Sequence, residues 1–94
     1  MTYNLDFVPL AKKEWDKLDA GIRQQFKKKL EKIVEAPHIP ASRLHGFECA
    51  YKIKQRSSGF RLVYEVYDSD IVVLVIAVGK REDNAVYDKA RDRV

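Results

Sequence analysis

Five side chains of types that bind phosphate and nucleobases occur in the second half of the chain. Lys52 and Lys54 stand two residues apart, Arg61 follows a short polar segment, and Arg81 and Tyr87 come later. Amines and guanidiniums hold phosphates and stabilise the charge that develops on them during phosphoryl transfer. A tyrosine ring can stack on an unpaired base. These residue types favour a site that binds a polyanion such as nucleic acid, although lysines that alternate along a strand are more often solubility residues.

The usual acid–base and metal-binding residues are scarce. His38 and His45 are the only histidines, and both fall in a proline-containing segment for which a surface or structural role is expected. Cys49 is the only cysteine, which excludes an internal disulfide and a multi-cysteine metal site. We therefore expect no cofactor and no metal.

Apolar periodicity predicts the elements that position these residues. Period-two alternation indicates strands, and spacings of three and four indicate helices. Hairpin turns should join the last three strands into an antiparallel meander. The predicted fold class is α+β, in the order β-α-α-β-β-β-α, with strands at about 3–7, 47–55, 60–67 and 71–79, and with helices that begin at Pro9, after Asp19, and after Asp83 or Asn84.

The second helix should be amphipathic. Its buried stripe is predicted to be Ile22, Phe26, Leu30 and Ile33, and Pro37 should end it. Basic side chains that we expect to contact a polyanion such as nucleic acid lie on the other side of this helix and near the strand ends: Arg23, Lys27, Lys28, Lys32, Arg56 and Lys80.

Alternation along the strands decides which side chains share a face of the sheet. If Tyr51 and Ile53 meet the two helices, then Lys52 and Lys54 emerge together with Arg61 on an uncovered face. Arg81 and Tyr87 can reach the same region, and Glu65 lies on this face by parity. The closing helix buries little beyond Ala85, Val86, Ala90 and Val94, so we expect it to be loosely docked.

The positive charge is concentrated in the middle of the chain. The net formal charge is +4, to which residues 20–36 contribute five bases and two acids, and residues 37–61 five bases and one acid. This distribution favours a polyanionic partner, or else reflects a solvated lysine-rich helix. The 94 residues are expected to form one domain over 1–94, without a membrane-spanning segment or signal peptide, in the cytoplasm.

Several segments together resemble the RelE branch of the RelE/ParE toxins of bacterial type II toxin–antitoxin systems. They are Tyr3-x-Leu-x-Phe, Lys13-Glu-Trp-x-Lys-Leu, the run from Cys49 to Tyr64, Val78-Gly-Lys-Arg-Glu, and Val86-Tyr87. The resemblance implies a microbial ribonuclease-like fold and a ribosome-dependent endoribonuclease that cleaves mRNA in the ribosomal A site. It also implies a RelB-like antitoxin as partner, and operator DNA only through the toxin–antitoxin complex. The active site that it implies is Lys52, Lys54, Arg61, Arg81 and Tyr87.

The resemblance makes Lys54 the general base for attack by the ribose 2′-OH. A free lysine has a pKa of about 10.4, so the pKa of Lys54 must fall towards neutrality. The charge of Lys52, about 6.7 Å along the strand, lowers it in that direction. Lys52 and Arg61 would hold the phosphate, Arg81 would face the leaving oxygen, and Tyr87 would stack on a base. Because such a site is poor in strong acids and bases, we expect the ribosome to supply the missing positioning.

Two alternatives stay open at this point. One is a ParE-like toxin of the same fold that acts on DNA gyrase without RNA chemistry. The other is an RNA-binding module without catalysis, since strands followed by a helix with a basic patch also suit binders of double-stranded RNA.

Overall fold

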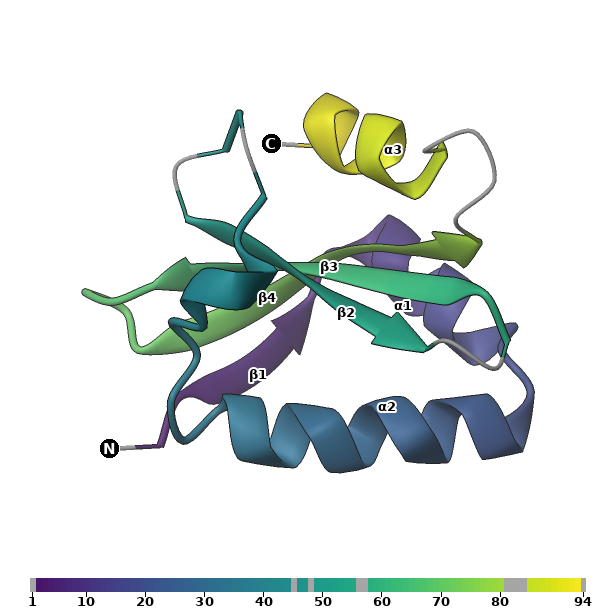
Figure 1. Ribbon diagram of the computed structural model, residues 1–94, viewed down its shortest axis with the longest axis horizontal. Helices are drawn as coiled ribbons and strands as arrows, with labels where there is room; N and C mark the ends of the chain where they lie inside the picture. Colours follow the sequence, from purple (N-terminus) through teal and green to yellow (C-terminus); the bar gives the residue numbers. More distant parts are fainter. Residues whose placement is uncertain (1, 45, 48, 56–57, 81–84, 94) are drawn as a thin grey trace.

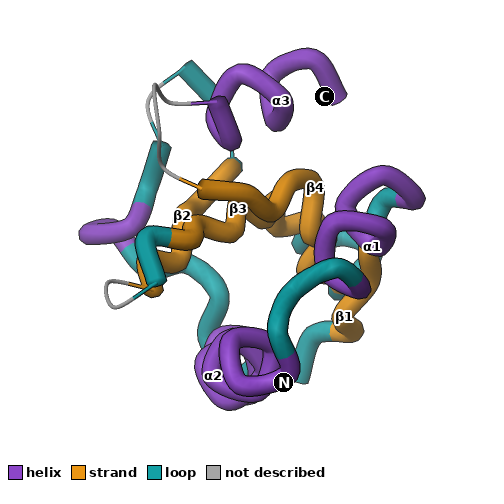
Figure 2. Tube along the Cα trace, turned by 90° about the vertical axis from the view of Figure 1, so that its right-hand side faces the viewer, coloured by secondary structure: helices purple, strands orange, loops and turns teal. Residues whose placement is uncertain are grey.

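The fold is a mixed four-stranded sheet with helices on both faces (Figures 1 and 2). The structure is a computed structural model that describes residues 2–44, 46–47, 49–55, 58–80 and 85–93. All of the predicted elements are present in the predicted order, and a short 3₁₀ turn, η1 (Pro40–Ser42), adds to them. Their bounds are β1 (Asn4–Phe7), α1 (Pro9–Asp16), α2 (Ala20–Ile33), β2 (Ala50–Gln55), β3 (Phe60–Tyr67), β4 (Val72–Lys80) and α3 (Ala85–Arg93).

The strands lie in the order β1-β4-β3-β2. β1 runs parallel to β4, and the other neighbours are antiparallel, so the predicted meander is confirmed and the sheet is mixed. β4 lies in the interior of the sheet, as its continuous apolar run predicts. A register shift between Val63 and Tyr64 leaves an extra residue in β4, so that Gly79 stands opposite Arg61.

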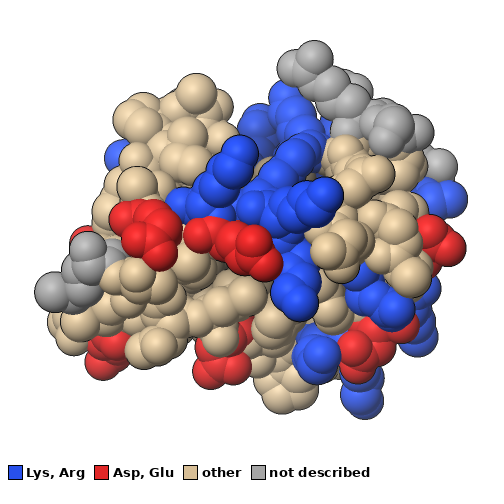
Figure 3. Space-filling view, turned by 90° about the horizontal axis from the view of Figure 1, so that it is seen from below, with Lys and Arg blue, Asp and Glu red and all other residues tan. Residues whose placement is uncertain are grey.

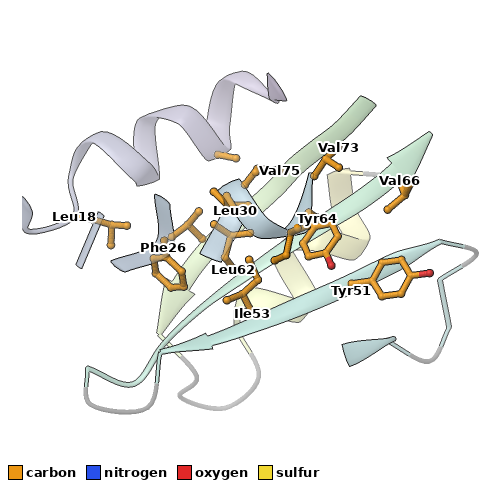
Figure 4. Close-up of a cluster of buried hydrophobic side chains, with 13 residues drawn as sticks. Leu18, Phe26, Leu30, Tyr51, Ile53, Leu62, Tyr64, Val66, Val73 and Val75 are labelled. Carbon is orange, nitrogen blue, oxygen red and sulfur yellow. The ribbon is translucent and has the colours of Figure 1, made fainter. Parts of the chain in front are cut away.

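One face of the sheet packs on α1 and α2 (Figure 4). Phe26 and Leu30 of the predicted α2 stripe are 0% and 2% exposed, and they meet apolar side chains of the strands such as Leu62. The predicted helix cap is confirmed, because the Asp19 carboxylate accepts a hydrogen bond from the Gly21 amide at 3.1 Å. This core fixes the orientation of β2 and β3 and therefore of the side chains on their other face.

The prediction that the other face is uncovered is wrong. α3 lies across it, and Val86 and Ala90 are fully buried against a second apolar cluster that includes Val63 and Ala77 (Figure 1). The reason is that this face carries small apolar residues among its cations, and these need cover from water. The looseness of the docking of α3 stays a prediction.

Element ends differ from the predictions by a few residues. β2 begins at Ala50 rather than at 47, because the preceding loop turns back and the Leu44 amide donates to the Ala50 carbonyl at 2.9 Å. β4 begins at Val72 because Ile71 has a positive φ of 55°. The predicted caps Asp83 and Asn84 lie outside the described residues. Within the part of the chain that the structure describes, no helix has the length and apolar character needed to cross a bilayer.

Candidate active site

The β2–β3 pairing brings three of the five predicted catalytic side chains together. Lys54 stands directly opposite Arg61, and Lys52 stands opposite Val63. Directly paired residues have their Cβ atoms about 5 Å apart, and diagonal neighbours about 7–8 Å. Lys52, Lys54 and Arg61 therefore form one cationic cluster on the face that carries α3, with Lys54 exposed and Lys52 half-buried.

Arg61 is buried, whereas we expected it to emerge on an open surface. Its side chain and backbone are only 6% exposed, and its Nη1 donates to the Phe60 carbonyl at 3.1 Å. Its Nε is fully buried and has no hydrogen-bond partner among the described residues. Burying a donor without a partner costs about 1–3 kcal/mol, and more for a charged group. Arg61 forms no ion pair with a described carboxylate, so its guanidinium adds positive charge to this region.

Glu65 lies on the same face, as its parity predicts, but it is distant from Arg61. The two are four residues apart on β3, which corresponds to about 13 Å along a strand. Glu65 instead accepts a hydrogen bond from the Tyr67 hydroxyl at 2.8 Å. That hydrogen bond, with some help from burial, raises the pKa of Tyr67 to about 12. Glu65 is therefore no counter-ion of the cationic cluster.

Tyr87 is carried over this region by α3. It is half-buried, and part of its ring packs against the second apolar cluster. It therefore anchors α3 and still has surface available for a ligand. Arg81 and Arg56, predicted as a catalytic and an RNA-binding residue, lie outside the described residues.

The remaining predicted RNA-binding residues form a separate group that faces away from α3. Lys27, Lys28 and Lys32 are exposed on α2, and Lys and Arg side chains gather in a continuous run on this side of the molecule (Figure 3). Arg23 is half-buried and donates to the Asp16 carbonyl at 3.0 Å. Lys80 lies over the Phe60 ring, 5.8 Å from its centroid. The sheet thus separates these residues from the cationic cluster, except near the exposed edge of β2.

Lys29 is a functional candidate that sequence reasoning missed. Its Nζ donates to the Lys54 carbonyl at 2.7 Å and so ties α2 to the end of β2. The sequence indicated that Lys29 lies beside the sheet, because Lys29 follows Ile22 by seven residues and therefore borders the buried stripe of α2.

A second missed group lies around Glu14 of α1. Its carboxylate accepts hydrogen bonds from the Val78 amide at 3.2 Å, from Arg93 at 2.7 Å, and from Lys89. Burial alone would raise the pKa of Glu14, but the hydrogen bonds from Arg93, Lys89 and the Val78 amide outweigh it and lower the pKa. Arg93 also donates to the Ile76 carbonyl at 2.9 Å. Side chains of α1 and α3 therefore form hydrogen bonds with backbone groups of β4 beyond the point where its pairing with β1 ends. The same side chains connect α3 to α1.

His38 has the structural role that we expected. Its Nδ1 lies 2.8 Å from the Tyr51 hydroxyl and its Nε2 lies 2.7 Å from the Asp68 carboxylate, which also accepts from the Tyr3 hydroxyl. The hydrogen bonds from His38 and Tyr3 lower the pKa of Asp68. His45 lies outside the described residues, and within the described ranges no three His, Cys, Asp or Glu residues lie close enough to hold a metal ion.

The arrangement can bind a phosphodiester and stabilise charge on it. Arg61, Lys52 and Lys54 supply positive charge on one face of the sheet, and Tyr87 supplies a partly exposed ring on the helix that covers this face. A lysine amine, once neutral, can also accept a proton from a ribose hydroxyl.

Comparison with known proteins gives consistent similarities. The model of the family described as "ParE toxin of type II toxin-antitoxin system, parDE" matches residues 5–85. The chain is 53% identical to the mRNA interferase toxin RelE of Escherichia coli K12, over 100% of this chain and 99% of that protein. A free-state structure of an arginine-to-alanine mutant of E. coli RelE superposes with a TM-score of 0.93 at 52% identity, covering 100% of this chain and 99% of that one. The toxin in the intact E. coli RelBE toxin–antitoxin complex gives 0.83 at 55% identity, covering 85% and 98%.

Proposed function

The chain belongs to the RelE/ParE family of type II toxins as a RelE-type member, and we propose that it is a ribosome-dependent mRNA endoribonuclease. It cleaves mRNA in the ribosomal A site and thereby inhibits translation in the cytoplasm. The observation that carries this proposal is the pairing of Lys54 with Arg61, whose buried Nε has no partner among the described residues. The similarity to a protein named mRNA interferase supplies the substrate class.

The cleavage proceeds by attack of a ribose 2′-oxygen on the neighbouring phosphorus. The O2′–P bond forms, the P–O5′ bond breaks, and the leaving 5′-oxygen takes a proton from water, so that a 2′,3′-cyclic phosphate and a 5′-hydroxyl result. Lys54, in its neutral form, accepts the 2′-OH proton. Lys52 and Arg61 hold the phosphate and stabilise its additional charge, Arg81 stabilises the leaving 5′-oxygen, and Tyr87 stacks on a base.

The ribosome supplies what these residues lack. The chain offers only a lysine as base and no strong general acid. By itself it therefore gives weak proton transfer, and the reaction depends on accurate positioning of the 2′-OH and the leaving oxygen. Fixing an in-line geometry contributes several kcal/mol to a reaction of this kind. Arg23, Lys27, Lys28, Lys32, Arg56 and Lys80 provide positive charge for contacts with RNA of the ribosome.

The partner of this chain in the cell is a RelB-like antitoxin. The support is its similarity, at 55% identity, to the toxin in the E. coli RelBE complex. Operator DNA is reached only through that toxin–antitoxin complex.

The test maps cut sites on one message by primer extension, with translating ribosomes and without them. Wild type should cut only with ribosomes, and Lys54→Ala and Arg81→Ala should each lose at least about 100-fold in rate. Lys13→Ala, which removes an exposed lysine of α1, is the control and should cut normally. Equal cutting of free and translated message, or full activity of Lys54→Ala, would refute the proposal.

A second candidate function is inhibition of DNA gyrase. It is favoured by the description of the matching family model, which names the ParE toxin. Induction of a gyrase toxin would cause DNA damage before translation falls, whereas an mRNA endoribonuclease would stop incorporation of labelled amino acids first.

A further inference from the structure

Three charged side chains join α3 to α1 beside the edge of β4. Glu14 of α1 accepts hydrogen bonds from Lys89 and from both terminal nitrogens of Arg93, the latter at 2.7 and 3.3 Å. Lys89 also donates to the Val78 carbonyl at 3.1 Å, and Arg93 donates to the Ile76 carbonyl at 2.9 Å. We call Glu14, Lys89 and Arg93 the α1–α3 cluster. It fixes α3 both to α1 and to the backbone of β4.

Apolar packing alone gives α3 a weak attachment to the sheet. The helix has nine residues, and an isolated helix shorter than about 12–15 residues is only marginally stable in water. Among its described side chains only Val86 and Ala90 are buried, and both are small. The side chains of Glu14 and Arg93 are 22% and 15% exposed, so water screens their ion pair only in part. The position of α3 over the sheet therefore depends strongly on the α1–α3 cluster (Figure 1).

The α1–α3 cluster adjoins the cationic cluster of the candidate active site. Gly79 of β4 stands opposite Arg61. A Cβ atom placed on Gly79 would lie 2.9 Å from Lys89 Nζ and 3.6 Å from Val86 Cβ, so α3 passes directly over this glycine. Tyr87 lies between Val86 and Lys89 in the same helix, and its ring packs in part on the apolar cluster beneath α3. A shift of α3 at the Lys89 contact therefore moves the Tyr87 ring relative to Arg61.

Glu14 also determines how much positive charge α3 presents. Its carboxylate pairs with Lys89 and Arg93 and offsets part of their charge. Neutralising that carboxylate raises the net charge by one and removes no cation that attracts RNA. A change at Glu14 should therefore alter the position of Tyr87 without weakening the attraction for RNA. An effect on the reaction can in this way be separated from an effect on binding.

We propose that Glu14 is a positioning residue for mRNA cleavage, which holds α3 through two cations of that helix so that Tyr87 reaches a base of the substrate. Glu14 itself touches neither the RNA nor the reacting atoms. The inference rests on the proposed function, which assigns stacking on a base to Tyr87. A small displacement is sufficient for a large effect, because a misplacement of about 1 Å can reduce a rate by about 100-fold.

The test measures cleavage of one message in single turnover on translating ribosomes at increasing toxin concentration, which yields a maximal rate and a half-saturating concentration. Glu14→Gln should lower the maximal rate about 10-fold and leave the half-saturating concentration within about twofold of wild type. Lys89→Gln removes one link and leaves Glu14 paired with Arg93, so it should lower the maximal rate by only about threefold. An unchanged maximal rate in Glu14→Gln, or a loss seen only as a higher half-saturating concentration, would overturn the proposal.

A double substitution tests whether Glu14 acts through Tyr87. Tyr87→Ala removes the ring that Glu14 is proposed to position. In that background, Glu14→Gln should lower the maximal rate by less than about a further twofold. A further loss of about 10-fold would show that Glu14 acts independently of Tyr87, which would overturn the proposal.

Two controls separate positioning from loss of stability or of charge. Leu30→Ala truncates a side chain that is 2% exposed in the core on the other face of the sheet, and Asp16→Asn removes an exposed carboxylate from α1. Both should keep the wild-type maximal rate per folded molecule, with the folded fraction measured by circular dichroism in the reaction buffer. A loss in Leu30→Ala equal to that in Glu14→Gln would show general destabilisation and would also overturn the proposal.

The failure of this inference is distinguishable from failure of the proposed function. If wild type cuts mRNA on ribosomes and Tyr87→Ala loses rate while Glu14→Gln does not, only the positioning role of Glu14 is wrong. If wild type fails to cut on ribosomes, the proposed function is wrong, whatever holds α3 in place.

Discussion

Replacement of Glu14 by glutamine would test how α3 is held over the sheet. The carboxylate receives hydrogen bonds from Lys89 and Arg93 of α3 and from the Val78 amide of β4. A hydrogen bond to a charged group contributes about 1.5–3 kcal/mol to stability. The side chains of Glu14, Arg93 and Lys89 are 22%, 15% and 37% exposed, so solvent screens part of this. We therefore expect Glu14→Gln to lower the free energy of unfolding by about 2 kcal/mol.

The measurement is urea unfolding combined with amide hydrogen exchange. Glu14→Gln should lower the urea midpoint by more than about 1 M and should reduce the protection of the α3 amides more than that of the α2 amides. The control is Asp16→Asn, because the ion pair of Asp16 with Lys12 has side chains that are 61% and 55% exposed. Such a pair contributes about 0.5 kcal/mol or less. Equal midpoints for Glu14→Gln and Asp16→Asn, with unchanged protection of α3, would refute the reasoning.

The dependence on pH gives a second measurement of the same effect. The pKa of Glu14 is lowered in the folded state, so its contribution to stability is present above the unfolded value of about 4.5 and is lost as the pH falls through the lower folded value. The difference in stability between wild type and Glu14→Gln should therefore shrink as the solution is acidified below about pH 4.5. A difference that stays constant down to full protonation would show that the charge of Glu14 is not what holds α3.

Three further substitutions have expected outcomes. Leu30→Ala should lower the free energy of unfolding by about 3 kcal/mol in urea titration, because the side chain is 2% exposed in the core beneath the sheet. Tyr51→Phe removes the hydroxyl that meets His38 and should cost about 1 kcal/mol in the same titration, with no loss of mRNA cleavage on ribosomes. Arg61→Met should leave stability unchanged or raise it by up to about 1 kcal/mol, because a buried donor without a described partner disappears, while cleavage on ribosomes falls at least about 100-fold.

Local periodicity was sufficient to predict most of the fold. The stripe that includes Phe26 and Leu30 identified the buried side of α2, and the apolar run of β4 placed that strand inside the sheet. Alternation also placed Lys52, Lys54 and Arg61 on one face, because the β2–β3 hairpin keeps its register along its full length. These features depend on contacts between residues that are close in the sequence or are joined by one turn.

The features that could not be predicted depend on contacts between distant segments. Alternation tells which side chains share a face, but it does not tell what lies over that face, so the cover provided by α3 was missed. Glu14 contacts Lys89 and Arg93, which follow it by 75 and 79 residues. The local pattern of each helix gives no indication that these three residues pair with one another. Lys29 was not considered, although its position relative to Ile22 places it beside the β2 edge.

The two polar groups that differ most from the sequence-based expectation have opposite effects on stability. Glu14 accepts a hydrogen bond from the Val78 amide at the unpaired part of β4 and connects three elements, so it stabilises α3 over the sheet. Arg61 lies on the face of the sheet that α3 covers, and its buried Nε has no described partner. The burial of Arg61 is therefore unfavourable in the absence of a bound anion. A bound phosphate would pair with the guanidinium and recover part of that cost, which adds to the affinity for RNA. We expect the stability supplied at Glu14 to offset the cost of burying Arg61, and a bound phosphate would lower that cost.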